Sequence, residues 1–350
     1  MINNYSAYSL GDFVNIVSDI GKRNSAVANT PPVLWFRGQR KYDWDLEPTI
    51  FRTIERERLK TEENARLEHF MAKNTHYFGR EFTCKSEWLE VMQHHAVKTR
   101  MLDWSESAMH SLIFTLECFF KSDTHLDADR KSAMPCMWVF EPQKWNRYVI
   151  ENIVKDAEIQ KTILNLYDNP SDKFEAQKKI DQMIAGGSSD LEVHSAEHLS
   201  WIFNLAQIEN TAMEFQNNSK LYLMQESELP FLYFMLYTIY ILMKKVAVDK
   251  IQPLAVTVPY HSERIRSQKG VFAVFPNYKI EGTVAVAKKM GINLLAMQNM
   301  DKINHCLHRI KLYNPHKIAY EMMNQGMNIS WLYPEMPVVS NEIEARKITI

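Results

Sequence analysis

Apolar positions along the chain follow two spacings, one typical of helices and one typical of short strands. A spacing of three and four residues predicts an amphipathic helix over residues 9–22 and a long charged helix over residues 54–77. Short runs of strand-forming residues predict strands at 33–37, 136–141, 253–259, 271–275, 283–287 and 308–312. The strands are scattered among helices without a regular alternation, which favours an α+β fold.

A long helical stretch separates the early strands from the late ones. Residues 142–250 are helical in pattern but weakly amphipathic, and GGSSD at 186–190 interrupts them. We therefore expect one domain over residues 1–350, built as a mixed or antiparallel small sheet packed by helices. Residues 142–250 would form a helical insert within that domain.

The most apolar run of the chain, residues 229–243, bears on membrane association. It has no charge but spans 15 residues, whereas a helix that crosses a bilayer needs about 20. We expect a buried helix there and no membrane partner. The N-terminus has neither the basic nor the apolar segment of a secretory signal, so the expected location is the cytoplasm.

Composition narrows the function classes. The net charge of −1 argues against a globally basic nucleic-acid binder but allows a local basic groove. Four cysteines stand far apart and none forms a CxxC pair, which is typical of buried free thiols. With 10 glycines, the chain has no GxGxxG and no P-loop motif, and it lacks a GxSxG elbow.

Residues 87–120 read as two apolar helices joined by a tight polar connection. The polar residues of this region are Gln93, His94, His95, Thr99, Arg100, Asp103 and Ser105. A polar cluster between two apolar helices is one way to hold side chains for chemistry or binding. The alternative is structural, with an Arg100–Asp103 ion pair and a helix cap at Asp103 or Ser105.

Arg37 closes the predicted strand at 33–37 and stands directly before Gly38. A ligand can approach closely beside a glycine because no side chain is present there. The guanidinium of Arg37 could then bind a phosphate or a carboxylate through two parallel hydrogen bonds. The alternative is a surface or ion-paired arginine in a turn.

A literal H-x-x-E-H motif occurs in the helical stretch. On a helix, His194 and His198 would share one face and could bind Zn²⁺, with Glu197 as general base. A third ligand would have to come from downstream, for example Glu226 or Glu228. Polar and charged neighbours favour the alternative, a solvated helix face in which the motif is incidental.

Four sequence blocks occur in an order that resembles the FRG-domain family, which is named for its Phe-Arg-Gly motif. The blocks are WFRGQ at 35–39, LEPTIFR at 46–52, QHHAVKTRMLDWSESAMHSLIF at 93–114 and RIRSQKGVFAVF at 264–275. The C-terminal segment from His308 also resembles that family's closing strand and helix. His95-Ala96 stands where the family usually has an aromatic residue and glycine.

The order of these motifs also resembles the layout of ADP-ribosyltransferases, and this resemblance implies roles for individual residues. Arg37, beside Gly38, would anchor NAD, the Thr99–Ser105 segment with Arg100 would form a pocket wall, and Arg264 would hold the pyrophosphate. His94 or Asp103 would orient a ribose hydroxyl or accept a proton, and Gln268 would act at the late strand. The usual E-x-E or Q-x-E motif is replaced by Gln268-Lys269-Gly270.

The resemblance therefore implies an NAD-dependent ADP-ribosyltransferase that acts as a toxin or phage-defence effector on a macromolecule. NAD would be a substrate, the acceptor RNA or protein, an antitoxin protein a further partner, and no metal is expected. A first alternative is a non-catalytic module that binds nucleic acid or protein through Arg37, Arg100, Arg264 and Arg266. A second alternative is a zinc hydrolase that uses the H-x-x-E-H motif.

Overall fold

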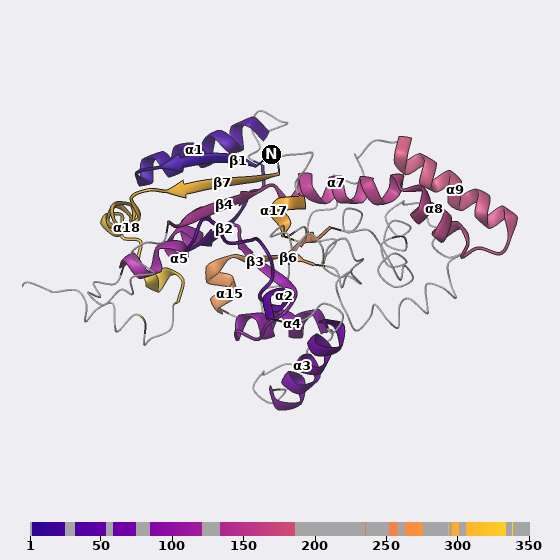
Figure 1. Cartoon of the computed structure of the whole chain (residues 1–350), viewed down its shortest axis with the longest axis horizontal. Coiled ribbons are helices and arrows are strands. Elements are labelled where there is room, and N and C mark those ends of the chain that lie inside the picture. Colours follow the sequence, from indigo (N-terminus) through magenta and orange to yellow (C-terminus); the bar gives the residue numbers. More distant parts are fainter. Residues whose placement is uncertain are drawn as a thin grey trace, which may run out of the picture.

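Figure 1 shows the fold in a computed structural model of the chain. The structure describes residues 2–24, 32–53, 59–74, 85–120, 134–185, 235, 252–257, 263–275, 293, 296–300, 306–333 and 338. The predicted strand at 283–287, the H-x-x-E-H motif and all of the apolar run at 229–243 except Met235 lie outside these residues.

Seven strands in the described part of the chain form one sheet. They are β1 (Asn3–Ala7), β2 (Trp35–Gln39), β3 (Met101–Ser105), β4 (Cys136–Phe140), β5 (Leu254–Val256), β6 (Gly270–Val274) and β7 (Leu307–Leu312). Their order is β1-β7-β4-β2-β3-β6-β5. β1 pairs with β7 in parallel and the other described pairs are antiparallel. The predicted mixed sheet of an α+β fold is therefore confirmed.

Helices pack on both faces of this sheet (Figure 1). One face is covered by α1 (Leu10–Asn24), α5 (Ala108–Phe120) and α18 (Pro315–Asn324). The opposite face of the sheet packs against α2 (Thr49–Thr53), α3 (Leu59–Asn74), α4 (Lys85–His94), α7 (Pro142–Lys155), α8 (Ala157–Leu164) and α9 (Pro170–Ala185). Shorter elements are α15 (Glu263–Gln268), α17 (Met297–Met300) and the 3-10 turn η4 (Ile329–Trp331).

The central strand β4 shows why two cores form. Successive side chains of a strand point to opposite faces. Met137 and Val139 join the core under α1, α5 and α18, while Cys136, Trp138 and Phe140 join the core on the other face. All five residues are buried, so β4 lies at the centre of the protein.

The described part of the predicted insert, residues 142–185, is helical. α7, α8 and α9 follow one another between residues 142 and 185, and Figure 1 shows α8 and α9 far from α18. The extent of the insert to residue 250 stays a prediction. None of the helices in the described ranges has both the length and the apolar character that a membrane crossing requires.

The predicted connection between two helices is wrong in one respect, because it contains β3 in the middle of the sheet. Asp103, the exposed centre of this strand, interrupts the apolar run and hides the strand signal. The helix cap proposed at Asp103 or Ser105 is also wrong. Ser107 precedes α5, and its hydroxyl oxygen accepts a hydrogen bond from the backbone N–H of His110 at 3.3 Å.

Gly38 lies inside β2 and does not end it, contrary to the prediction. A Cβ atom at this position would lie 1.6 Å from Oγ1 of Thr115 and 3.0 Å from the backbone oxygen of Ser111. Both residues belong to α5, so glycine is required for this helix to pack directly against the strand. Arg37 is consequently a mid-strand residue with a fixed backbone.

α4 ends in a Schellman motif that has alanine where glycine is usual. The N–H of Val97 donates to the oxygen of Met92 at 2.8 Å, and the N–H of Ala96 donates to Gln93 at 3.1 Å. Ala96 has a φ of 61°, in the left-handed region. The same motif ends α18, where Gly326 has a φ of 78°. The backbone therefore has the shape that glycine favours, although the residue is alanine.

We expect Ala96→Gly to stabilise the protein by about 0.5–1 kcal/mol. The left-handed conformation costs alanine roughly 1–2 kcal/mol, and the greater chain entropy of glycine offsets part of that gain. Urea unfolding would measure the difference, and Gly326→Ala should shift stability in the opposite direction. A destabilised Ala96→Gly variant would contradict the assigned backbone conformation.

Candidate functional site

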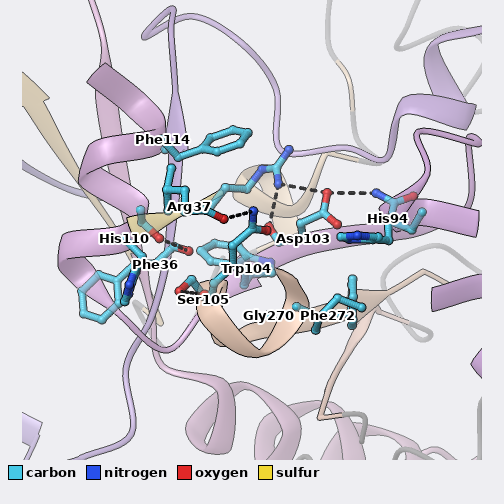
Figure 2. A pocket seen from close by; sticks show the side chains of 16 residues that line it. Phe36, Arg37, His94, Asp103, Trp104, Ser105, His110, Phe114, Gly270 and Phe272 are labelled. Carbon is cyan, nitrogen blue, oxygen red and sulfur yellow. Dashed lines mark hydrogen bonds and ion pairs between the residues drawn. The ribbon is translucent and has the colours of Figure 1, made fainter. Parts of the chain in front are cut away.

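A pocket forms where β2 and β3 separate within the sheet. These two strands share a single residue pair, Phe36 with Ser105, whereas β2 shares five pairs with β4 and β3 shares five with β6. The pocket has a volume of about 240 Å³. It is lined by Phe36, Arg37, Gly38, Gln93, His94, Asp103, Trp104, Ser105, His110, Ser111, Phe114, Ile265, Gln268, Gly270, Phe272 and Leu332 (Figure 2).

Arg37 bridges the gap between the two strands. Its Nη1 donates to the backbone oxygen of Asp103 at 2.6 Å and lies 3.6 Å from the Oδ2 of the same residue. The side chain is 22% exposed. Its Nε is buried and has no hydrogen-bond partner in the described structure. Burial lowers the pKa of Arg37, and nearby Asp103 opposes this shift, but an arginine stays charged. Arg37 therefore offers a fixed positive charge with an unused donor.

A relay of hydrogen bonds positions the carboxylate of Asp103. Nε2 of Gln93 donates to Oδ2 of Asp103 at 2.9 Å, and Oγ1 of Thr99 donates to Oε1 of Gln93 at 2.7 Å. Thr99 is 1% exposed and is not among the residues that line the pocket. Asp103 itself is half exposed. Thr99 therefore acts on the pocket through Gln93, and Asp103 presents a negative charge beside Arg37.

The expected pair between Arg100 and Asp103 is wrong. Residues three apart on a strand point to opposite faces, and Arg100 instead contacts Glu63 of α3. Its Nε lies 3.3 Å from Oε2 of Glu63, and its backbone N–H donates to Oε1 at 2.9 Å. Both side chains are almost fully buried. Arg100 therefore anchors α3 to the start of β3, and it does not line the pocket.

α15 and the C-terminal segment form the opposite wall. Oγ of Ser105 donates to the backbone oxygen of Gln268 at 2.6 Å, and Nε2 of Gln268 donates to the oxygen of Leu332 at 3.2 Å. These bonds hold Gln268 at the pocket, as the prediction requires. The backbone of Arg264 belongs to α15, while its side chain lies outside the described part of the structure.

His94 comes from the last turn of α4 and lines the pocket on the side of Asp103 (Figure 2). Its ring packs edge-on against that of His95, with centroids 5.2 Å apart. The predicted residues Arg37, Gly38, His94, Asp103 and Gln268 therefore converge on one pocket from four elements.

Sequence reasoning did not single out His110 and Phe114. They lie four residues apart on α5, a spacing that places two side chains on one helix face, and both line the pocket. Phe114 is 48% exposed. Nδ1 of His110 is buried without a hydrogen-bond partner among the described residues. Burial, followed by the charge of Lys269, lowers the pKa of His110, so its imidazole is neutral near pH 7.

His110 should make the protein less stable in mild acid. The unfolded chain binds a proton at an ordinary pKa of about 6.5, whereas the folded state resists that proton down to a lower pH. The stabilising contribution is therefore complete above about pH 6.5 and is lost as pH falls through the folded pKa. His110→Gln should reduce the loss of stability between about pH 7.5 and 5.5 in urea unfolding. His69→Gln, the same substitution at an exposed residue of α3, provides the control.

The zinc interpretation finds no support in the described ranges, where His, Cys, Asp and Glu do not gather into a group of three that could hold a metal. His194, Glu197 and His198 themselves lie outside those ranges, so the prediction that their motif is incidental is not tested.

The pocket lies in the sheet of a mixed α+β domain. A comparison with protein families matches the part of the chain that supplies most of the residues lining this pocket. The family model of the FRG domain matches residues 33–124. The matched residues include β2, α4, β3 and α5, and three of the four sequence blocks that resemble this family lie within them. No curated protein and no solved structure matched the chain.

Proposed function

We propose that this pocket binds NAD and that the protein transfers ADP-ribose from NAD to a macromolecular acceptor, either RNA or protein. The observation that carries the proposal is the guanidinium of Arg37, which lines a pocket between two separated strands and is held by the backbone oxygen of Asp103. A guanidinium held in this way is suited to an anionic ligand such as a pyrophosphate.

The size of the pocket limits how much of NAD it holds. Sites for drug-sized ligands typically measure about 300–1,000 Å³, and this pocket measures about 240 Å³. One end of a dinucleotide fits this volume, with the remainder extending past Arg37. The half-exposed ring of Phe114, at the same pocket, supplies an apolar surface for a planar base.

The residues of the pocket suit the charge changes of the reaction. The bond between ribose C1′ and the nicotinamide nitrogen breaks, and the electron pair leaves with nicotinamide. Positive charge develops on the ribose, where the carboxylate of Asp103 can stabilise it. An acceptor nucleophile then bonds to C1′ and loses a proton, for which His94 or neutral His110 is a suitable base.

The biological setting follows from the family resemblance, and it belongs to the same proposal. An enzyme that modifies RNA or protein with ADP-ribose would act as a toxin or a phage-defence effector, and an antitoxin protein would restrain it. Expression of the wild type in bacteria should then be toxic, and a variant without Arg37 should not be.

Gln268→Ala should lower kcat for nicotinamide release about 10- to 100-fold while NAD affinity changes less. A residue close to the reacting ribose contributes most in the transition state. Affinity can be followed by the NAD-dependent rise in melting temperature. Ser267→Ala is the matched control, because Oγ of Ser267 also donates to the oxygen of Leu332, at 3.4 Å. Equal loss of activity in both variants would instead assign Gln268 a purely structural role.

A non-catalytic binding module is the second candidate, and one observation favours it. Asp103 supplies the only carboxylate among the described residues that line the pocket, and Gln268-Lys269-Gly270 has no glutamate. Such a module would bind an anionic group at Arg37 without reaction. Protection by NAD against heating, without release of nicotinamide, would support this candidate over the enzyme.

A further inference from the structure

β7 pairs with β1 at one edge of the sheet (Figure 1). Cations and aromatic rings gather near this pair and form a second surface of interest. We call it the basic–aromatic strip, and it consists of Tyr8, Tyr42, Arg309, Lys311 and Tyr313. It arises from the alternation of β7, since Ile310 and Leu312 are buried under the helices of one face. Arg309 and Lys311 therefore point to the other face.

The members of the strip hold one another in place. The guanidinium carbon of Arg309 lies 3.6 Å from the centroid of the Tyr42 ring. Nζ of Lys311 lies 5.0 Å from the Tyr42 ring and 4.9 Å from the Tyr313 ring. The rings of Tyr8 and Tyr313 stack with centroids 4.9 Å apart. The strip is thus a continuous row of positive charges and aromatic rings, with the two stacked rings of Tyr313 and Tyr8 at one end.

Within the described ranges no carboxylate lies at ion-pair distance from the cations of the strip, although Arg309 donates to Oδ1 of Asn4 and to the backbone oxygen of Tyr42. By contrast, Lys317 pairs with Glu321 and Lys178 pairs with Glu175. The chain as a whole has nearly equal numbers of acidic and basic residues. At one end of the strip Tyr8 is 51% exposed and Tyr313 is 38% exposed. Unpaired cations beside accessible rings fit a partner that offers both negative charge and planar groups.

We propose that the basic–aromatic strip binds single-stranded nucleic acid. Lys311 and Arg309 would contact phosphates, while a base would stack on the exposed ring of Tyr8, which Tyr313 supports from its other face. Single strands offer unpaired bases for such stacking, and a duplex does not. An acidic peptide offers negative charge for the cations of the strip but no planar bases for its aromatic rings.

A single strand, β4, separates β7 of the strip from β2, which carries Arg37. Trp138 of β4 pairs with Arg309 on one side and with Arg37 on the other. Adjacent strands lie about 4.8 Å apart, so the backbones at Arg309 and Arg37 are separated by about 10 Å. The binding inference does not depend on the reaction proposed for the pocket, because it rests on the strip alone.

The test is a titration of the full chain, without NAD, against fluorescent oligonucleotides of about twelve nucleotides, long enough for one small site. We expect the wild type to bind oligo-U RNA or oligo-dT DNA more tightly than a duplex of the same length. A preference between the two single strands would show whether ribose or deoxyribose is favoured. Tyr8→Ala should weaken binding at least about fivefold, since stacking on one ring contributes about 1–3 kcal/mol. Tyr8→Phe should restore it.

A second variant tests whether the positive charge of Lys311 contacts a phosphate of the bound nucleic acid. Lys311→Gln should lower the slope of log affinity against log salt by about 0.7, the value for one phosphate contact on a single strand. Tyr320→Ala and Lys178→Gln are matched controls, since both residues are exposed on other helices. Melting curves of each variant would establish that it is folded.

Three outcomes would overturn the inference. The first is that no single strand binds to the wild type. The second is that duplex DNA or poly-glutamate binds as well as single strands. The third is that the strip variants behave like their controls.

Discussion

Replacing Arg37 with lysine is expected to lower the rate of nicotinamide release about 100-fold or more, as the loss of one preorganised donor typically does. Nη1 of Arg37 is already committed to the backbone oxygen of Asp103, so ligand binding depends on the rest of the planar group. Lysine keeps the charge but loses the rigid planar group whose separate nitrogen atoms donate in fixed directions to two partners. Release of nicotinamide from NAD by the purified variant measures the effect.

The stability of the same variant separates ligand binding from folding. Loss of the hydrogen bond between Arg37 and the backbone of Asp103 should lower the free energy of unfolding by about 1 kcal/mol. The variant should therefore stay folded while its activity is lost. Arg40→Lys is the matched control, because Arg40 is half exposed and pairs with Glu117 at 3.7 Å. Full activity in Arg37→Lys would contradict the role of Arg37 in the pocket.

Replacing Glu63 with alanine is expected to destabilise the protein by about 3–5 kcal/mol. Glu63 accepts the backbone N–H of Arg100 and lies 3.3 Å from the guanidinium, and both side chains are buried. Removal of one partner leaves the other charge buried and unpaired, which is far more costly than loss of an exposed pair. Urea unfolding followed by circular dichroism measures the change.

The neighbouring residue provides the control for that experiment. Glu62 lies one position earlier on α3 and is 3.9 Å from Arg66 at the surface. Glu62→Ala should change stability by less than about 1 kcal/mol. The double variant Glu63→Leu/Arg100→Met should recover part of the loss, because no charge then remains unpaired. Equal effects of Glu62→Ala and Glu63→Ala would show that the Arg100 pair contributes little.

Strands with strong apolar runs could be predicted from the sequence, and polar strands could not. β4 and β7 lie where residues 136–141 and 308–312 were expected. β1 has the sequence NNYSA, whose polar residues suit the exposed edge of a sheet and carry no apolar signal. β3 was missed because Asp103 faces the pocket in the middle of a buried strand.

Residues of the pocket could be predicted where a motif marked them, as at Arg37, Asp103 and Gln268. The partner of Arg100 could not, because it depends on the alternation of a strand that the pattern did not reveal. Glu63 is 37 residues away on a helix whose charge pattern resembles a solvated surface. His110 was missed because its environment arises from the packing of α5 against the split between β2 and β3.

The most direct test of the central claim is incubation of the purified protein with doubly labelled NAD and a cell lysate, followed by separate isolation of RNA and protein. One label is in the nicotinamide and the other is in the adenosine. We expect free nicotinamide and an equal amount of adenosine label on either RNA or protein, both of which should be lost in Arg37→Lys. Intact NAD and unlabelled macromolecules, in lysate from a susceptible host with or without phage components, would contradict the transferase and leave the pocket as a binding site.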